Sequence, residues 1–181
     1  MTLDKKYYPY ILAVVIGISG FLTGCLINKE LSQKLMDIMT SYLKNVSFTF
    51  TGVFVNNFTS ALIMIIGGIL IGLPGLLLGF VNFMMLGSAF QIFGSKMGVL
   101  YFLAAVLPHG CFELTAIIIS IGLGFKLASV ILQWFAVKDS GIFHRQLLSI
   151  IKKTLIIVLP LLVLAAFIEV YITPHIVKLI K

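Results

Sequence analysis

Two acidic residues and one histidine stand in stretches of sequence that are otherwise apolar. Glu113 follows His109 by four residues, so both side chains project from one face if the backbone there is helical. Glu169 stands near the end of a second apolar stretch. Such side chains could line an ion pathway or hold helices together through hydrogen bonds. The polar set that we expect to lie inside the membrane comprises Asn56, Asn57, Asn82, His109, Gly110, Glu113 and Glu169.

The chemistry of this polar set admits several interpretations. An acid at the centre of a membrane span costs roughly 2.5 to 3.5 kcal/mol, and each Leu, Ile, Phe or Val returns about 0.3 to 0.6 kcal/mol, so insertion alone does not demonstrate a function. The first interpretation is a hydrogen-bonded network that fixes helix packing. The alternative is a transport or ion pathway lined by His109, Glu113 and Glu169. A metal or intramembrane hydrolase site is least favoured, because neither His-Glu-x-x-His nor Gly-x-Ser-x-Gly occurs. We therefore expect no catalytic residue, no metal and no cofactor.

The composition assigns the chain to the bilayer. Of its 181 residues, 60% are hydrophobic and only 10% are charged, and the mean hydropathy is +1.15. Soluble domains carry about a quarter charged residues, so the composition excludes a soluble enzyme, a disordered protein and a nucleic-acid-binding module. The expected partner is the lipid bilayer, and the net charge of +7 is a signal of topology and not a nucleic-acid footprint.

The apolar stretches predict an all-α, polytopic membrane protein made of a single domain over residues 1–181. At about 20 residues per span, we expect about five transmembrane segments, at residues 7–27, 52–73, 74–94, 98–125 and 154–173. Residues 28–46 have helical apolar spacing with charges on the opposite face, which indicates an amphipathic helix in the membrane interface, with Asn28 as its N-cap. The localisation expected is multi-pass, in the plasma membrane.

The fourth of these segments is interrupted by Pro108-His109-Gly110, and the sequence leaves its course open. It is expected to break there, with Pro108 and Gly110 as the breaking residues. If it crosses once, Lys and Arg divide seven to six between the two sides, whereas a re-entrant segment divides them nine to four. The positive-inside rule favours the second count, but Lys5 and Lys6 before the first span favour an inside N-terminus.

Small residues recur at spacings that allow close contact between helices. In lipid, helix association depends on such close backbone approach. The pattern supports a compact bundle and a homo-oligomer. The packing glycines are Gly20, Gly24, Gly68, Gly72, Gly75, Gly79 and Gly87.

The segment around His109 resembles a known family. Pro108-His109-Gly110-Cys111-Phe112-Glu113 looks like the Pro-His-Gly-x-x-Glu signature of the stage II sporulation protein M family, also called DUF95. Three further features agree in order: Asn57 with the Gly-rich span after it, Asn82 with Gly87, and the helix end from Glu169 to Pro174. Phe83 stands where the family pattern Asn-Gly-x-x-x-Gly has its first Gly.

The resemblance implies a small helical membrane protein with five spans. The family's namesake is a membrane scaffold that works with cell-wall hydrolases during engulfment in endospore formers, and relatives occur in organisms that make no spores. We therefore expect a non-enzymatic scaffold or assembly protein that contacts other membrane or envelope proteins. The alternative is a transporter or channel for an ion or a small or lipidic substrate, using His109, Glu113 and Glu169.

Overall fold

The structure, a computed structural model, describes residues 7–43 and 47–180, and it consists of helices. No strand occurs within these two ranges. The elements in chain order are α1 (Tyr8–Leu26), α2 (Lys29–Leu43), α3 (Phe50–Ile66), η2 (Gly67–Leu70), α4 (Leu73–Met97), α5 (Val99–Val137), α6 (Ser140–Lys153), η3 (Thr154–Val158), α7 (Leu159–Phe167), η4 (Ile168–Ile172) and α8 (Thr173–Lys178). The all-α class expected from the composition is confirmed.

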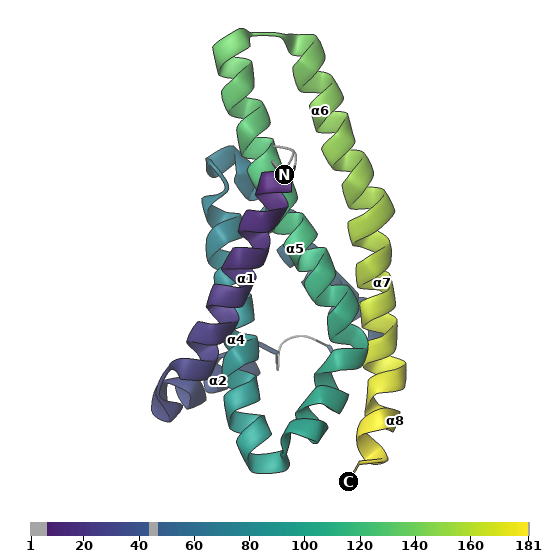
Figure 1. Ribbon diagram of the computed structural model, residues 1–181. Helices are drawn as coiled ribbons and strands as arrows, with labels where there is room; N and C mark the ends of the chain where they lie inside the picture. The colour runs from purple at the N-terminus through teal and green to yellow at the C-terminus, as the bar shows by residue number, and fades with distance from the viewer. Residues whose placement is uncertain (1–6, 44–46, 181) are drawn as a thin grey trace, which may run out of the picture.

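Within the described residues, five continuous helical stretches are long and apolar enough to cross a membrane, which also confirms the expected span number. They are α1, α3 with η2, α4, α5, and the 39-residue run from Ser140 to Lys178 that joins α6 to α8. These stretches alternate in direction along the chain (Figure 1). The beginning of α1, η2 and the α5–α6 connection lie toward one end of the bundle, whereas α2, the α4–α5 connection and α8 lie toward the other.

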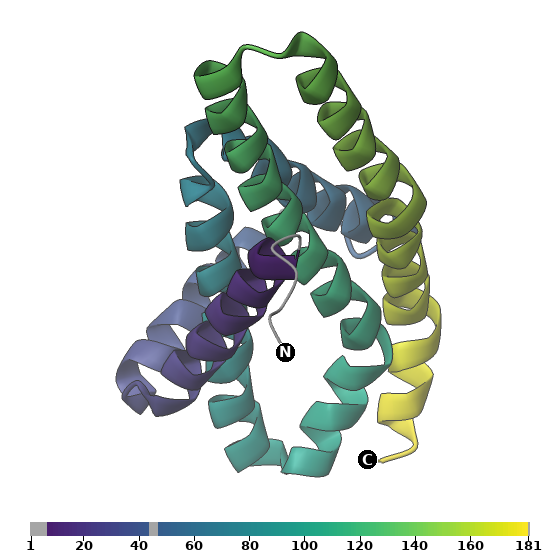
Figure 2. The same ribbon diagram turned by 45° about the horizontal axis from the view of Figure 1, so that its top comes forward.

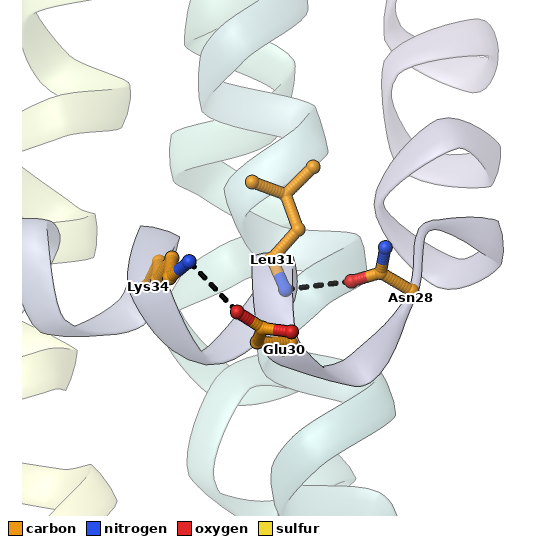
Figure 3. A network of polar contacts seen from close by, with 4 residues as sticks. All are labelled: Asn28, Glu30, Leu31 and Lys34. Carbon is orange, nitrogen blue, oxygen red and sulfur yellow. Dashed lines mark hydrogen bonds and ion pairs between the residues drawn. The ribbon is translucent and has the colours of Figure 1, made fainter.

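The amphipathic segment after α1 forms α2 and runs across the direction of the neighbouring helices (Figure 3). Asn28 caps it as expected, because its Oδ1 accepts a hydrogen bond from the backbone N–H of Leu31 at 2.8 Å. Gln91 of α4 fixes this corner. Its amide donates to the carbonyls of Cys25 and Ile27, which end α1, and its Oε1 accepts from the hydroxyl of Ser32. Residues 44–46 of the expected helix lie outside the described part of the chain.

The expectation that the helix breaks at Pro108–Gly110 is wrong, because α5 bends but continues through these residues. The helix has 39 residues with Pro108 in its interior, and Figures 1 and 2 show that its axis changes direction between its ends. Proline has no N–H to donate to the carbonyl four residues earlier, and its ring clashes there, which bends a helix without ending it when the flanking turns are packed. The segment therefore crosses the bundle once and is not re-entrant.

The last helix contains two π-helical segments, each placed just before a proline. η3 precedes Pro160 and η4 precedes Pro174. In an α-helix the missing N–H of each proline would leave one carbonyl without its bond, and the wider π turn is one way to accommodate such a local change. The second π segment carries Glu169.

All seven glycines expected to pack helices lie at close contacts between helices of one chain. A Cβ on Gly20, Gly24 or Gly87 would collide with backbone between α1 and α4. The other four, Gly68, Gly72, Gly75 and Gly79, each face α3 or α5 at less than 3.1 Å from an added Cβ. The homo-oligomer thus draws no support from these glycines and stays a prediction.

Phe83 does not prevent close packing of α4. Its ring is 6% exposed and belongs to a buried cluster with Ala13 and Ile16 of α1. A Cβ on Gly17 would lie 3.1 Å from this ring. At this contact Gly17 of α1 is therefore the small residue, and Phe83 of α4 is the large one.

The α1–α4 contact yields a test of the fold. Gly24→Ala is expected to lower the free energy of unfolding by about 1 to 3 kcal/mol, because the added methyl group meets the backbone of Met84 and Ser88. Gly94→Ala is the matched control, since an added Cβ there would meet only the ring of Phe90 at 3.8 Å. Thermal unfolding of both variants in detergent measures the difference. Equal melting temperatures for Gly24→Ala and the unsubstituted protein would contradict the packing described.

Candidate functional site

His109, Glu113 and Glu169 come together between α5 and η4. One ring nitrogen of His109 and one carboxylate oxygen from each glutamate all lie within 4.8 Å of one another. Glu169 stands 56 positions after Glu113 and 60 after His109, so only the packing of the last helix against α5 brings it to the other two. We call these three residues the polar triad.

Two pairs of residues spaced by four positions face each other in this contact. His109 and Glu113 stand on α5, and Glu169 and Thr173 stand on the last helix, which runs in the opposite direction. His109 Nδ1 lies 3.2 Å from Thr173 Oγ1, while the two glutamates meet one turn away. Thr173 is buried and was not among the residues expected from sequence. Its spacing of four from Glu169 was the signal that could have found it.

A cavity of about 920 Å³ reaches the triad from the end of the bundle where α2 and the α4–α5 connection lie. Glu113 and Glu169 form part of its wall. Tyr42, Phe48 and Met97 are exposed residues at its rim. Glu113 is half-buried, and its side chain lines the cavity. The carboxylates are thus reachable from one end of the bundle.

The bend in α5 contributes to this wall. The turns before Pro108 supply Tyr101, Phe102, Ala105 and Val106 to the cavity. Gly110, which follows the proline, is buried and does not line it. Pro108 and Gly110 therefore act on the shape of the site and not on its chemistry.

The three asparagines expected in the polar set all line the cavity. Asn56 accepts a hydrogen bond from the hydroxyl of Tyr42 at 2.9 Å and donates one to Asn57 at 3.2 Å. Asn82 faces the same space from α4 without a side-chain hydrogen bond to any described residue. Tyr42, at the end of α2, is a polar contributor that the sequence did not indicate.

The two carboxylates have no partner of opposite charge in the part of the chain that the structure describes. Neither Glu113 nor Glu169 has a hydrogen bond or an ion pair there, and none of the described residues around the cavity is a lysine or an arginine. Buried charges are normally paired or bound to a metal. Within the described residues, hydrogen bonds join only part of the polar set, and both carboxylates stand outside them.

The site and the helices together define a class of protein: a multi-pass helical membrane protein with a cavity that enters the bundle from one end and carries two carboxylates in a mostly apolar wall. The sequence pattern of the family described as Stage II sporulation protein M matches residues 11–174 of this chain. The chain belongs to this family, as the segment from Pro108 to Glu113 had indicated. It is not a known family of enzymes.

A relative in Methanocaldococcus jannaschii supports the assignment. It is described as "Uncharacterized protein MJ0793" and is 31% identical over 172 residues, which cover 93% of this chain and 95% of the relative. No solved structure matches the chain significantly.

The unpaired carboxylates lead to a prediction about stability. Glu113→Gln is expected to raise the melting temperature of the metal-free protein at pH 8, because it removes a repulsion between neighbouring charges at Glu169. A gain of about 1 kcal/mol corresponds to roughly 2 to 4 °C for a chain of this size. Thermal unfolding in detergent with EDTA measures it.

Glu30→Gln provides the matched control for this change. Glu30 is exposed on α2 and forms a 2.8 Å ion pair with Lys34, so its loss should leave the melting temperature unchanged or slightly lower. A Glu113→Gln variant less stable than both the control and the unsubstituted protein would mean that the Glu113 carboxylate stabilises the fold.

Proposed function

We propose that this protein is a non-enzymatic membrane transporter that admits a cation into the cavity and binds it at the polar triad. The observation that carries the proposal is the cavity of about 920 Å³, which brings two carboxylates together with no lysine or arginine among its described lining residues. Ionisable residues at membrane depth commonly mark ion or substrate pathways. A cation would neutralise the two glutamates.

The remaining wall of the cavity suits a cation that sheds part of its water. Asn56, Asn57 and Asn82 offer amide oxygens on the way to Glu113. Most other lining residues are apolar, and a low-dielectric wall strengthens the attraction between a cation and the carboxylates. Entry from the bundle end near α2 is therefore favoured for positive charge.

The packing beyond the triad supports a carrier over an open channel. One and two turns after Glu113 on α5, Ile117 and Ile121 are at most 3% exposed, and they pack with Met64 of α3. This cluster lies between the triad and the opposite end of the bundle. A site reached from one end and covered at the other is the arrangement that alternating access requires.

A scaffold or assembly role is the second proposal, and the α5–α6 hairpin favours it. At 1.5 Å per residue, α5 is about 58 Å long, nearly twice the roughly 30 Å thickness of the hydrocarbon core. Its last turns and α6 rise together at one end of the bundle (Figure 1), and Phe135 and Val137 there are 66% and 68% exposed. Another membrane or envelope protein, or a second copy in the same plasma membrane, could bind this hairpin.

Cation uptake into vesicles tests the transport proposal. We expect the full-length protein in liposomes to take up at least one cation from a set of Na⁺, K⁺, Mg²⁺, Mn²⁺ and Co²⁺, measured as the metal content of washed vesicles. Glu169→Gln should lower the rate at least tenfold, because it removes one of the two cavity carboxylates.

The same uptake assay provides a control variant and a result that would contradict transport. Glu30→Gln removes an exposed acid that neither lines the cavity nor belongs to the triad, so uptake should be unchanged. Uptake no faster than in protein-free vesicles for all five cations would contradict transport and leave the scaffold role as the better proposal.

A further inference from the structure

We propose that the polar triad is a binding site for a divalent transition-metal ion such as Mn²⁺, Co²⁺ or Zn²⁺, held by His109, Glu113 and Glu169. The inference rests on the proposed function, since it names the class of cation that the cavity admits. It goes further in assigning a ligand role to each of the three side chains.

The separation of the ligand atoms fits one shared ion after a small contraction. In a tetrahedral site with bonds of about 2.1 Å, ligand atoms lie roughly 3.4 Å apart. The three atoms here already lie within 4.8 Å of one another, on two helices that are in contact. Rotation about the side-chain bonds of the two glutamates can close the difference without a change of backbone.

The carboxylate of Glu113 independently indicates a missing ligand. The side chain is half-buried, lines the cavity and has no hydrogen bond or ion pair within residues 7–43 and 47–180. A carboxylate held in a mostly apolar wall without a partner is costly, and a coordinated cation is one of the few groups that can satisfy it. Glu169 adds a second such group on the same wall.

The backbone around Glu169 is also shaped for this contact. Glu169 is the second residue of the π segment η4. Such single-turn segments occur frequently at functional sites, because the wider turn changes the direction in which a side chain points. Here the segment brings the Glu169 carboxylate to the His109 and Glu113 side of the helix.

Thr173 supplies the outer contact that metal-binding histidines usually have. Its hydroxyl lies 3.2 Å from His109 Nδ1, which fixes the orientation of the ring. A hydrogen bond at one ring nitrogen selects the tautomer and leaves the other nitrogen to bind the ion. Nε2 is then the ligand atom that His109 offers.

The charge of the triad and its ligand types favour one class of ion. Two ionised carboxylates and a neutral imidazole carry a charge of −2, which a divalent cation neutralises. Mg²⁺ and Ca²⁺ prefer oxygen ligands throughout, whereas an imidazole with carboxylates suits the divalent transition metals. Three protein ligands also leave a coordination position toward the cavity, as in exchangeable sites and unlike closed structural ones.

Co²⁺ absorption measures the proposed site directly. The full-length protein in detergent, freed of metal with EDTA and exchanged into buffer, is titrated with CoCl₂ while visible absorption and heat are recorded. We expect one Co²⁺ per chain, and at least a tenfold weaker Kd for His109→Gln, Glu113→Gln and Glu169→Gln. Thr173→Val should weaken binding by about tenfold with the same 1:1 stoichiometry, because it removes only the contact that orients the ring.

His175→Gln is the matched control for the histidine change. His175 is exposed on α8, and its Nδ1 bonds the carbonyl of Tyr171 one turn earlier in the same helical run. Its loss should leave the Kd and the absorption spectrum of bound Co²⁺ unchanged. A thermal shift on adding CoCl₂, present in this control and lost in Glu113→Gln, separates loss of the ligand from loss of the fold.

The outcomes distinguish this inference from the transport proposal. Unchanged Co²⁺ affinity in all three triad variants, or Mg²⁺ binding as tight as Co²⁺ binding, would overturn the metal site. Uptake of Na⁺ or K⁺ by a protein that does not bind Co²⁺ would also overturn it, while supporting transport. Tight Co²⁺ binding at the triad without uptake of any cation would support the site and overturn transport.

Discussion

Inside a bilayer, each backbone N–H and C=O must find its partner within the protein, and this constraint shapes the structure most where proline prevents it. Pro108, Pro160 and Pro174 stand inside long helices, and each removes one α-helical hydrogen bond. The first coincides with a bend in α5, and the other two follow π segments. The wall of the cavity and the placement of Glu169 both depend on these local departures from the α-helix.

Glycine contacts provide the rigidity against which these irregular segments are held. α1 meets α4 through Gly20, Gly24 and Gly87, and η2 meets α5 through Gly68. Because lipid provides little hydrophobic drive for helices to associate, such close backbone approach supplies the packing. Gln91 adds the hydrogen bonds that close the α1–α2 corner. The polar triad lies between α5, which these contacts help to hold, and the last helix, which packs on α5 through Val158 and Leu162.

Sequence patterns predicted the class and the number of spans because both follow from apolar length. The same patterns predicted Asn28 as a helix cap, since capping is a local interaction between neighbouring residues. They failed at Pro108, where the flanking helix packs on several neighbours and continues through the proline. They also missed Gln91, Thr173 and Tyr42, whose partners lie 14 to 66 positions away along the chain.

The sequence by itself therefore determined that the chain lies in a lipid bilayer, that it is helical, and which polar residues stand in its apolar stretches. Glu113 and Glu169 could be recognised one at a time, because an acid in an apolar stretch is a local feature. Only the tertiary structure decided that both carboxylates line one cavity, with His109 beside them and no lysine or arginine among the described lining residues. The physical reason is that their meeting depends on how the last helix packs against α5, and that packing is set by side chains spread over the whole bundle.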